Sequence, residues 1–326
     1  MPNPNIAEHG ISAGAKATFR PSAKKERRNL RHTGTLCEIL KIFNYMDQNI
    51  LQFIFSTFQE AFEFMRPGLE NYQKFSMSLS QPVKIKENEN IQYSFDIELD
   101  RLIKNNLEKF SISGKIFSEE SGFFEFGKNN YRVVYDPFCN STLATRTFQE
   151  AAVGISIFSY DYKFITSAIM DYQTGIMGIV ENEKTNFYQI QSKEKLIFDY
   201  PKNKALENSW SVIALENREA RKEIDKLSEI LKNSKRVVIG SGHIYWLKLA
   251  MGVIDAYADP IGGEKLYEMF ACTVAQNNGC LVSDKTGKYF DPVENLKIFE
   301  NDQKYIYYPV ATTNEALHNQ ILKGIK

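Results

Sequence analysis

The sequence predicts an α+β fold in which helices and sheets are stacked in layers. Segments with the three-to-four-residue apolar spacing of helices lie between short runs rich in β-branched and aromatic residues. These segments interleave without the regular strand–helix–strand cadence of a doubly wound parallel sheet, which favours a layered α+β architecture. With 326 residues, 43% of them hydrophobic, the chain can bury a substantial core as one large domain or two small ones.

The composition is that of an ordinary globular protein and argues against several classes of partner. The 40 basic and 40 acidic residues cancel, so no global field favours a nucleic acid or a membrane surface. No uncharged apolar run approaches the ~18 residues that a membrane span requires. The 4 cysteines lack CxxC spacing, which indicates reduced thiols in the cytoplasm or another reducing compartment.

The N-terminal segment differs from the rest of the chain. It is rich in Lys and Arg between Lys16 and Arg31, contains one acid there, Glu26, and has no apolar stretch of the secretory type. We interpret residues 1–35 as a basic, disordered tail. An organelle-targeting segment and a docking arm for a polyanion are the alternatives, and no other segment has a nucleic-acid signature.

The first half of the ordered chain, residues 36–205, is predicted to begin with helices. Apolar residues recur at helical spacing from Leu36 to Phe43 and from Ile50 to Met65, and Pro67-Gly68 is predicted to stop the second helix. A third amphipathic helix is predicted from Asp96 to Phe110. Five strands follow, the last two joined by a hairpin turn: Lys115–Phe117, Tyr131–Tyr135, Val153–Phe158, Phe164–Asp171 and Ile176–Glu181.

The second half, residues 206–326, is predicted to be α/β. Its expected strands and helices alternate as Trp210–Leu215 (strand), Arg218–Lys232 (helix), Arg236–Ile239 (strand), Tyr245–Met251 (helix), Val253–Ala258 (strand) and Leu266–Gln276 (helix). Gly240-Ser241-Gly242 lacks the third glycine of a nucleotide-binding loop, so it is interpreted as a tight strand-to-helix turn.

Two short segments carry the side chains with the clearest chemistry. Ser118-Glu119-Glu120-Ser121 precedes a β-rich run, and Tyr135-Asp136-Pro137-Phe138-Cys139-Asn140-Ser141 closes that run. Carboxylates in such positions offer the hard oxygen ligands that Mg²⁺ prefers. The arrangement resembles the metal-binding core of the inositol monophosphatase and fructose-1,6-bisphosphatase superfamily. The pattern of that family is Glu-Glu, then a strand that ends in Asp-Pro-Ile/Leu-Asp-Gly-Thr/Ser.

Further landmarks of the same family follow in order. They are Asp96-Ile-Glu-Leu-Asp100 at a helix start, Gly240-Ser-Gly-His243 with Gly252-Val-Ile-Asp-Ala-Tyr257, and Leu266-Tyr-Glu268 running to Asp284. The segment from Val310 to His318 resembles the closing strand and helix of the family. No landmark is complete, but together they span most of the chain. The resemblance implies a layered αβαβα sandwich of the sugar and inositol phosphatase type.

The resemblance also implies an activity and a metal site. It implies a Mg²⁺-dependent phosphomonoesterase acting on an inositol phosphate or sugar phosphate, with Mn²⁺ as an alternative ion, in a chain that forms homodimers. Glu120, Asp136 and the backbone carbonyl of Phe138 would form the first metal site, with Glu119 as a further candidate ligand. Two metal ions in such enzymes activate water and stabilise the leaving oxygen.

The catalytic and substrate-binding roles are carried over in the same way. Ser141, helped by Asp96, would position or deprotonate the attacking water, although both residue types are also common helix caps. Asn140 and Ser141 would bind the phosphate at a helix start. Asp259 stands where the family places an acid that accepts substrate hydroxyls, and a plain loop acid is the alternative.

The chain departs from the family pattern at the second metal position. Cys139 replaces the second Asp, and a thiol is a poor ligand for Mg²⁺ and a better one for Zn²⁺. We expect an inert buried thiol there, because no His lies nearby in the sequence. The remaining ligand is Glu268 if the helix register shifts by one residue; otherwise Tyr267 fills the site. Asn140 replaces a Gly, and although Asn tolerates positive φ, its side chain would crowd the phosphate.

Two functions therefore stay open. In the first, the chain is a phosphatase with an impaired second metal site. In the second, it is a catalytically inactive pseudoenzyme that keeps the fold to bind a phosphorylated ligand or a protein partner. We favour the phosphatase, because Asp96, Glu120, Asp136 and Ser141 are all present. In an inactive chain, neutral mutation would be expected to replace these residues independently of one another.

Overall fold

The computed structural model describes residues 48–70, 82–85, 91–141, 150–200, 202, 204–215 and 221–325. The chain divides into Met1–Ile42 and a compact unit from Phe43 to Lys326, and every described residue belongs to the second of these. The predicted basic tail and the predicted helix over 36–43 lie outside the described residues.

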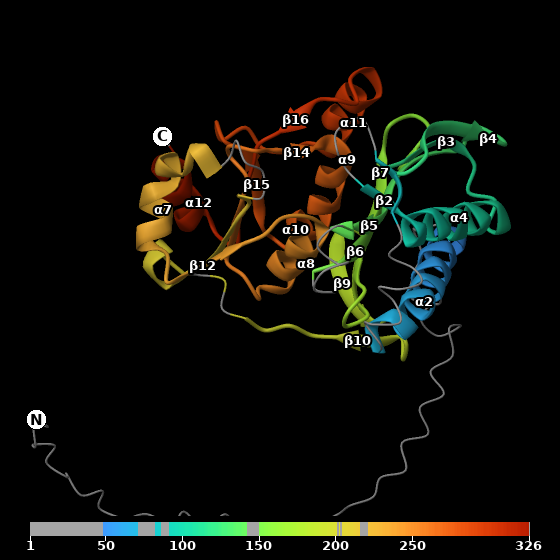
Figure 1. Cartoon of the computed structure of the whole chain (residues 1–326), viewed down its shortest axis with the longest axis horizontal. Helices are drawn as coiled ribbons and strands as arrows, with labels where there is room; N and C mark the ends of the chain where they lie inside the picture. The colour runs from blue at the N-terminus through green and yellow to red at the C-terminus, as the bar shows by residue number, and fades with distance from the viewer. Residues whose placement is uncertain are drawn as a thin grey trace, which may run out of the picture. The chain divides into compact units, whose positions relative to one another are not determined.

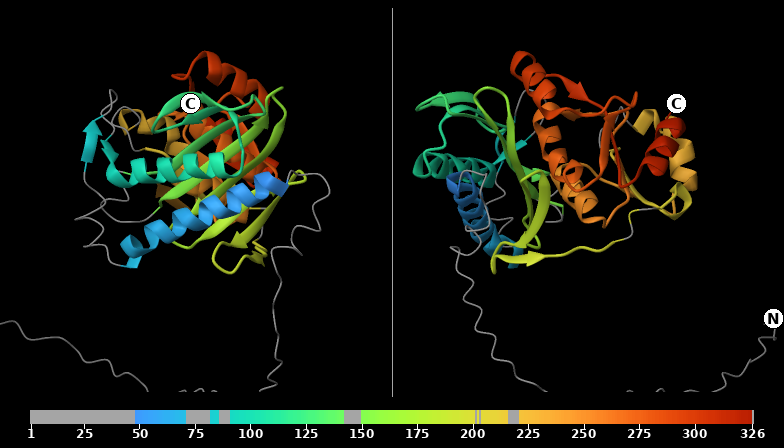
Figure 2. Two further views of the ribbon diagram at one scale, coloured as in Figure 1. Left: turned by 90° about the vertical axis from the view of Figure 1, so that its right-hand side faces the viewer. Right: turned by 180° about the vertical axis from the view of Figure 1, so that it is seen from behind.

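Two helices form the first layer and cover one face of a large sheet (Figure 1; Figure 2, left). They are α2 (Gln48–Glu70) and α4 (Ser94–Lys109), and their fully buried side chains include Phe58 and Leu99. The stop predicted at Pro67-Gly68 is wrong, because α2 continues to Glu70. A proline so close to the end removes only one hydrogen bond from the last turns, so the helix can run a few residues past it.

The second layer is an eight-stranded sheet that contains all five strands predicted for the first half. All neighbouring strands are antiparallel except β3 and β5. In spatial order the strands are β10 (Glu194–Leu196), β9 (Lys184–Gln189), β8 (Ile176–Glu181), β7 (Phe164–Asp171), β6 (Ala152–Ser159), β5 (Tyr131–Cys139), β3 (Gly114–Ser118) and β4 (Gly122–Phe126). The predicted hairpin turn after β7 is confirmed, with Gly175 N–H donating to the Asp171 carbonyl at 2.8 Å.

One feature of β5 positions the site. The predicted strand ended at Tyr135, but the observed strand continues to Cys139 through a β-bulge. Asp136 pairs with Gly154 and Cys139 with Ala152, so β5 has one more residue than β6 in this interval. Side chains of a regular strand alternate between faces, and the extra residue therefore brings Asp136 and Cys139 to the same face. Pro137, which has no N–H to donate, lies inside the bulge.

Helices between the two main sheets form the middle layer. They are α8 (His243–Met251), α9 (Leu266–Met269), the 3₁₀ turn η3 (Phe270–Cys272), α10 (Thr273–Gln276) and α11 (Pro292–Asn301). Trp246 and Phe270 are fully buried there, in one cluster with Val134 of the first sheet and Val212 of the second. The single helix predicted over 266–276 is thus broken by a 3₁₀ turn, and Cys272 and Cys280 lie in this core.

The second main sheet and two outer helices complete the layers. The sheet order is β12 (Arg236–Ile239), β11 (Trp210–Ile213), β13 (Ala256–Ala258), β17 (Pro309–Thr312) and β15 (Leu281–Asp284). On its far face lie α7 (Ser228–Asn233) and α12 (Glu315–Gly324), with the 3₁₀ turns η1 (Leu206–Asn208) and η2 (Ile224–Leu227). Two small ribbons pair β1 (Pro82–Ile85) with β2 (Ile91–Tyr93) and β14 (Glu264–Lys265) with β16 (Ile306–Tyr307).

These layers confirm the predicted αβαβα sandwich and the closing strand and helix, β17 and α12 (Figure 1; Figure 2, right). Two predicted elements of the second half differ. The helix over 218–232 is interrupted by η2 in its described part, and the strand over 253–258 shortens to β13 because Gly252 and the turn after it precede the strand. The division into halves at 205/206 stays a prediction. None of the helices in the described ranges has both the length and the apolar character needed to cross a membrane.

Candidate active site

The parallel pair β3 and β5 brings the predicted carboxylates together. Parallel neighbours end at the same edge of a sheet, and Ser118 at the end of β3 pairs with Tyr135 just before Asp136. Glu119 N–H donates to the Tyr135 carbonyl at 3.0 Å, which fixes the start of the acidic segment beside the bulge. Asp96 is the third residue of α4, whose first turn lies against the same strand end through the contact of its side chain with Ser141.

A hydroxyl, a carboxylate and a backbone carbonyl meet at Ser141. Its Oγ lies 2.9 Å from Asp96 Oδ1 and 2.9 Å from the Phe138 carbonyl oxygen. The other oxygen of Asp96 accepts the backbone N–H of Tyr93 at 2.8 Å, which closes a capping box at the start of α4. The carboxylate is therefore held in one orientation toward the Ser141 hydroxyl.

The carbonyl of Phe138 is held in place by packing. The Phe138 ring lies between Phe95 and Tyr172, with ring centroids 4.6 and 4.9 Å away. The Tyr172 hydroxyl donates to the Pro137 carbonyl at 2.7 Å, and Phe138 N–H donates to Asp136 Oδ1 at 2.9 Å. The bulge therefore presents its carbonyl and its carboxylate in a fixed relation.

Asp136 lies at the centre of a group of acidic side chains. It is 4% exposed. Burial, followed by the charges of Glu119 and Glu268 and a smaller effect of Asp96, holds its pKa well above the usual range. Burial and like charges both disfavour ionisation of Asp136, and a nearby cation would relieve this repulsion.

The two adjacent glutamates point to different neighbours. Glu119 Oε1 accepts the Tyr267 hydroxyl at 3.4 Å, and the charge of Glu119 acts on Asp136. Glu120 instead accepts the side-chain amide of Gln92 on β2. The prediction that named Glu120 as the principal ligand stays a prediction, and the acidic group around Asp136 is built with Glu119.

Helix α9 delivers both residues that the sequence offered as alternatives. Glu268 is half-buried, and burial is the main cause that raises its pKa to about 7, with Lys265 lowering it and Glu119 raising it. Its charge also raises the pKa of Asp136, so the carboxylate lies near the acidic group. Tyr267 is buried beside it and donates to Glu119, so it joins Glu268 at the group rather than replacing it.

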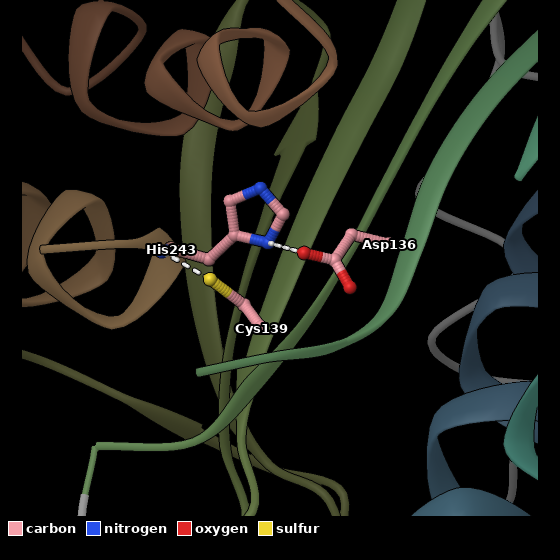
Figure 3. A group of neighbouring side chains, drawn as sticks. All are labelled: Asp136, Cys139 and His243. Atoms are coloured by element: carbon pink, nitrogen blue, oxygen red, sulfur yellow. Dashed lines mark hydrogen bonds and ion pairs between the residues drawn. The ribbon is translucent and has the colours of Figure 1, made fainter. Parts of the chain in front are cut away.

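A histidine that the sequence analysis did not select lies against Cys139 (Figure 3). The backbone N–H of His243 donates to Cys139 Sγ at 3.4 Å, and its ring Nδ1 lies 3.9 Å from Asp136 Oδ2. Burial raises the pKa of the Cys139 thiol well above its usual range and lowers the pKa of His243 to about 4. A thiol in that state is no active nucleophile. The available signal was His243 itself, the last residue of the Gly240-Ser-Gly-His243 landmark.

The remaining predicted residues have mainly backbone partners. Asn140 adopts φ +69°, and its amide Nδ2 donates to the Ser241 and Glu150 carbonyls at 2.8 and 3.0 Å. Asp259 is buried in the loop after β13, where Oδ1 accepts Gly262 N–H at 2.9 Å. Phosphate binding by Asn140 and hydroxyl binding by Asp259 stay predictions. The segment after Ser141, residues 142–149, lies outside the described ranges.

The site therefore has two sides with different metal preferences. The side formed by Glu119, Asp136, the Phe138 carbonyl and Glu268 offers oxygen atoms, the type of ligand that Mg²⁺ and Mn²⁺ prefer. The side formed by Cys139 and His243 offers sulfur and nitrogen and does not fit Mg²⁺.

Comparison with known proteins identifies the fold. The sequence matches no protein-family model and no curated protein sequence. The structure is similar to the extragenic suppressor protein SuhB from Bartonella henselae (TM-score 0.68, 16% identity, covering 85% of this chain and 98% of that chain). It is also similar to the IMPase TM1415 of Thermotoga maritima (0.65, 14%, 85% and 96%) and to inositol monophosphatase-II of Staphylococcus aureus (0.62, 15%, 85% and 92%). The chain thus has the fold of the inositol monophosphatases, as the sequence resemblance predicted.

Proposed function

We propose that this chain is a phosphomonoesterase that depends on a divalent metal and acts on an inositol phosphate or sugar phosphate. The observation that carries the proposal is the Ser141 hydroxyl, 2.9 Å from both Asp96 Oδ1 and the Phe138 carbonyl, at the strand end where Asp136 lies. The substrate class is supported by a similar structure, SaIMPase-II, that was solved with inositol monophosphate bound. The same protein was also solved with 2′AMP, a second phosphomonoester.

Mg²⁺ or Mn²⁺ would be held by Glu119, Asp136, the Phe138 carbonyl and Glu268. We place Glu119 in this set ahead of Glu120, because the charge of Glu119 acts on Asp136. Such an ion lowers the pKa of a bound water and neutralises charge on the phosphate.

The protein's own groups orient the water and accept its proton. Ser141 Oγ can accept a proton from the attacking water while its own proton passes to Asp96 Oδ1. Asp96 Oδ2 is already committed to Tyr93 N–H, so Oδ1 is the oxygen that serves as base. The clamped Phe138 ring keeps this geometry in place before substrate arrives.

A pseudoenzyme is the second candidate, and a specific observation favours it. A buried thiol, Cys139, stands where the family pattern has its second Asp, and the buried imidazole of His243 lies beside it. Loss of a carboxylate ligand of the second metal should lower the rate by several orders of magnitude. In that case the fold binds a phosphorylated ligand or a protein partner without hydrolysing it.

The test is a calorimetric titration with Mg²⁺ and Mn²⁺, with phosphate release from a panel of inositol and sugar phosphates measured in parallel. We expect binding at millimolar concentration or tighter, with turnover that Asp136→Asn abolishes. Asp171→Asn, at a buried aspartate of the same sheet outside the site, is the control and should keep both properties.

The glutamate pair supplies a second, matched comparison. Glu119→Gln should weaken metal binding, and Glu120→Gln should leave it close to that of the wild type. Metal binding without turnover on the whole panel would favour the pseudoenzyme. The absence of both metal binding and turnover would contradict the phosphatase.

A further inference from the structure

Three side chains with three different donor atoms converge at the bulge of β5 (Figure 3). Within the described part of the chain, Asp136, Cys139 and His243 are the group whose possible metal-ligating atoms all lie within 4.8 Å of one another. The bulge supplies the first two residues, and the first residue of α8 supplies the third. Their exposed fractions are 4%, 6% and 1%, so the group is shielded from bulk solvent.

Neither ring nitrogen of His243 makes a hydrogen bond of normal geometry among the described residues, although the backbone of Glu268 interacts with the ring. Buried polar groups in native proteins are nearly always hydrogen-bonded, and leaving one without a partner costs about 1–3 kcal/mol. The ring also cannot turn freely, because it is packed against Gly154 of β6. A ligand that binds a ring nitrogen would offset this cost.

Two glycines make room for the group. A Cβ on Gly154 would lie 2.7 Å from His243 Nδ1, and a Cβ on Gly242 would lie 2.6 Å from Cys139 Sγ. Gly242 also has φ +94°, a conformation that L side chains rarely adopt. The backbone around Cys139 and His243 is therefore shaped to hold these side chains together.

The donor set selects the class of ion. Sulfur, imidazole nitrogen and one carboxylate oxygen suit Zn²⁺ and similar borderline cations, whereas Mg²⁺ requires oxygen. Tetrahedral Zn²⁺ with bonds of about 2.0–2.3 Å holds its ligand atoms about 3.3–3.7 Å apart. The observed 3.9 Å between His243 Nδ1 and Asp136 Oδ2 is close to that spacing. The backbone N–H that donates to Cys139 Sγ would stabilise the thiolate.

We infer that Asp136, Cys139 and His243 bind one borderline divalent cation such as Zn²⁺. The fourth coordination position of the cation would be open to water or a phosphate oxygen. The site would share Asp136 with the carboxylate group formed with Glu119 and Glu268. The inference deepens the proposed function by naming the second ion. The inference shares one residue with the proposed function, because both use Asp136 as a metal ligand. It is otherwise independent, since the cation can bind whether or not the chain hydrolyses a phosphate.

Cobalt provides the test, because a thiolate bound to Co²⁺ produces a charge-transfer band that oxygen ligands do not produce. Metal-free protein is titrated with Co²⁺ under reducing, anaerobic conditions. The triple variant Cys37→Ser/Cys272→Ser/Cys280→Ser is titrated beside it, so that Cys139 is its only thiol. We expect one equivalent of Co²⁺, the intense visible bands of four-coordinate cobalt, the charge-transfer band in both proteins, and displacement by Zn²⁺.

Variants of the cluster complete the test. Cys139→Ser should abolish the charge-transfer band, and His243→Ala and Gly154→Ala should each weaken Co²⁺ binding by at least about tenfold. Absence of the band in the folded triple variant, or its persistence in Cys139→Ser, would overturn the inference. Absence of the band together with Mg²⁺-dependent phosphate release would overturn this inference alone. A cobalt site without turnover under any metal would overturn the proposed phosphatase alone.

Discussion

Asp96 uses its two oxygens for two different purposes. Oδ2 accepts the Tyr93 backbone N–H and closes the first turn of α4, and Oδ1 accepts the Ser141 hydroxyl. The sequence left open whether Asp96 was a helix cap or a catalytic group, and in the structure its carboxylate bonds both the Tyr93 N–H and the Ser141 hydroxyl. A carboxylate that the backbone already holds in place does not have to reorient when a reaction begins, so no free energy is spent on its reorganisation.

The two purposes can be separated by the substitution Asp96→Asn. Asparagine can still accept the Tyr93 N–H, so the free energy of unfolding should change by less than about 1 kcal/mol. Asparagine cannot act as a base, so the rate of phosphate release should fall about 10²–10⁴-fold. Urea unfolding and steady-state phosphate release measure the two quantities.

The control for this substitution is Asp291→Asn, which changes the cap of α11 outside the site. Asp291 Oδ1 accepts the N–H groups of Val293 and Glu294 at 2.8 Å. This variant should keep both stability and activity. An Asp96→Asn protein with wild-type turnover would show that Asp96 is a structural cap only.

Which residues of the site could be predicted depended on how far apart in the chain the partners lie. Asp136, the Phe138 carbonyl, Ser141 and Asp96 form motifs that can be read locally. Which of the adjacent residues Glu119 and Glu120 faces the bulge depends on where β3 ends, and the sequence does not fix that end to a single residue. The contact between Cys139 and His243 joins residues 104 positions apart through a strand-to-helix turn, so no local pattern reports it.

At the scale of elements, the bulge of β5 shows where strand prediction failed. The strand was predicted to end at Tyr135, yet the bulge accommodates Pro137, which cannot donate a ladder hydrogen bond, and pairing resumes at Cys139. Long amphipathic helices such as α4 and β-branched strands such as β7 and β8 were predicted within a few residues. The short polar strand β9, the edge strand β4 and the two-residue strands were missed, because their pairing is set by neighbours and not by periodicity.

The hairpin of β8 and β9 contains an ionisable group that should make stability depend on pH. Glu181 is 2% exposed, and burial raises its pKa to about 7, against weaker opposing hydrogen bonds from Tyr188 and Asn186. One carboxylate oxygen, Oε1, has no hydrogen-bond partner among the described residues. The folded protein therefore retains this proton at pH values where the unfolded chain has lost it.

The sign follows from linkage. The contribution of Glu181 to stability is fully present below its ordinary pKa of 4.5 and is lost as the pH rises through about 7. At about 1.4 kcal/mol per pKa unit, the loss is on the order of 3 kcal/mol. Glu181→Gln should flatten the pH dependence of the urea-unfolding free energy between these limits, and the exposed Glu194→Gln should not. Equal slopes in Glu181→Gln and wild type would contradict the shifted pKa.

At the scale of the whole molecule, the middle layer connects residues from both predicted halves. Its cluster combines Phe117 and Val134 from the first half with Trp246 and Phe270 from the second. A buried ion pair adds a polar link, because Arg132 of β5 binds Glu300 of α11. The guanidinium lies 3.8 Å from the centroid of the Tyr162 ring, and the Tyr162 hydroxyl donates to Glu300 Oε2 at 2.7 Å.

This link leads to a prediction about cooperativity. The Arg132 and Glu300 side chains are 6% and 15% exposed. Arg132→Met would therefore leave a nearly buried carboxylate whose remaining partner among the described residues is the Tyr162 hydroxyl. Removing one partner of a buried pair costs about 3–5 kcal/mol, whereas replacing both partners with apolar residues costs less. Urea unfolding of Arg132→Met should therefore show a large loss that Arg132→Met/Glu300→Leu partly restores. Unfolding should stay a single transition in both variants, because the apolar middle layer still joins the halves.

The nearby exposed pair of Lys163 and Asp161 is the matched control. Its Nζ–Oδ2 distance is 3.0 Å, but the side chains are 79% and 62% exposed, so Lys163→Met should change the unfolding free energy by less than about 1 kcal/mol. If Arg132→Met costs no more than Lys163→Met, the ion pair does not stabilise the contact between β5 and α11. Two separate transitions in Arg132→Met would instead mean that this pair, and not the shared apolar layer, makes the two halves unfold together.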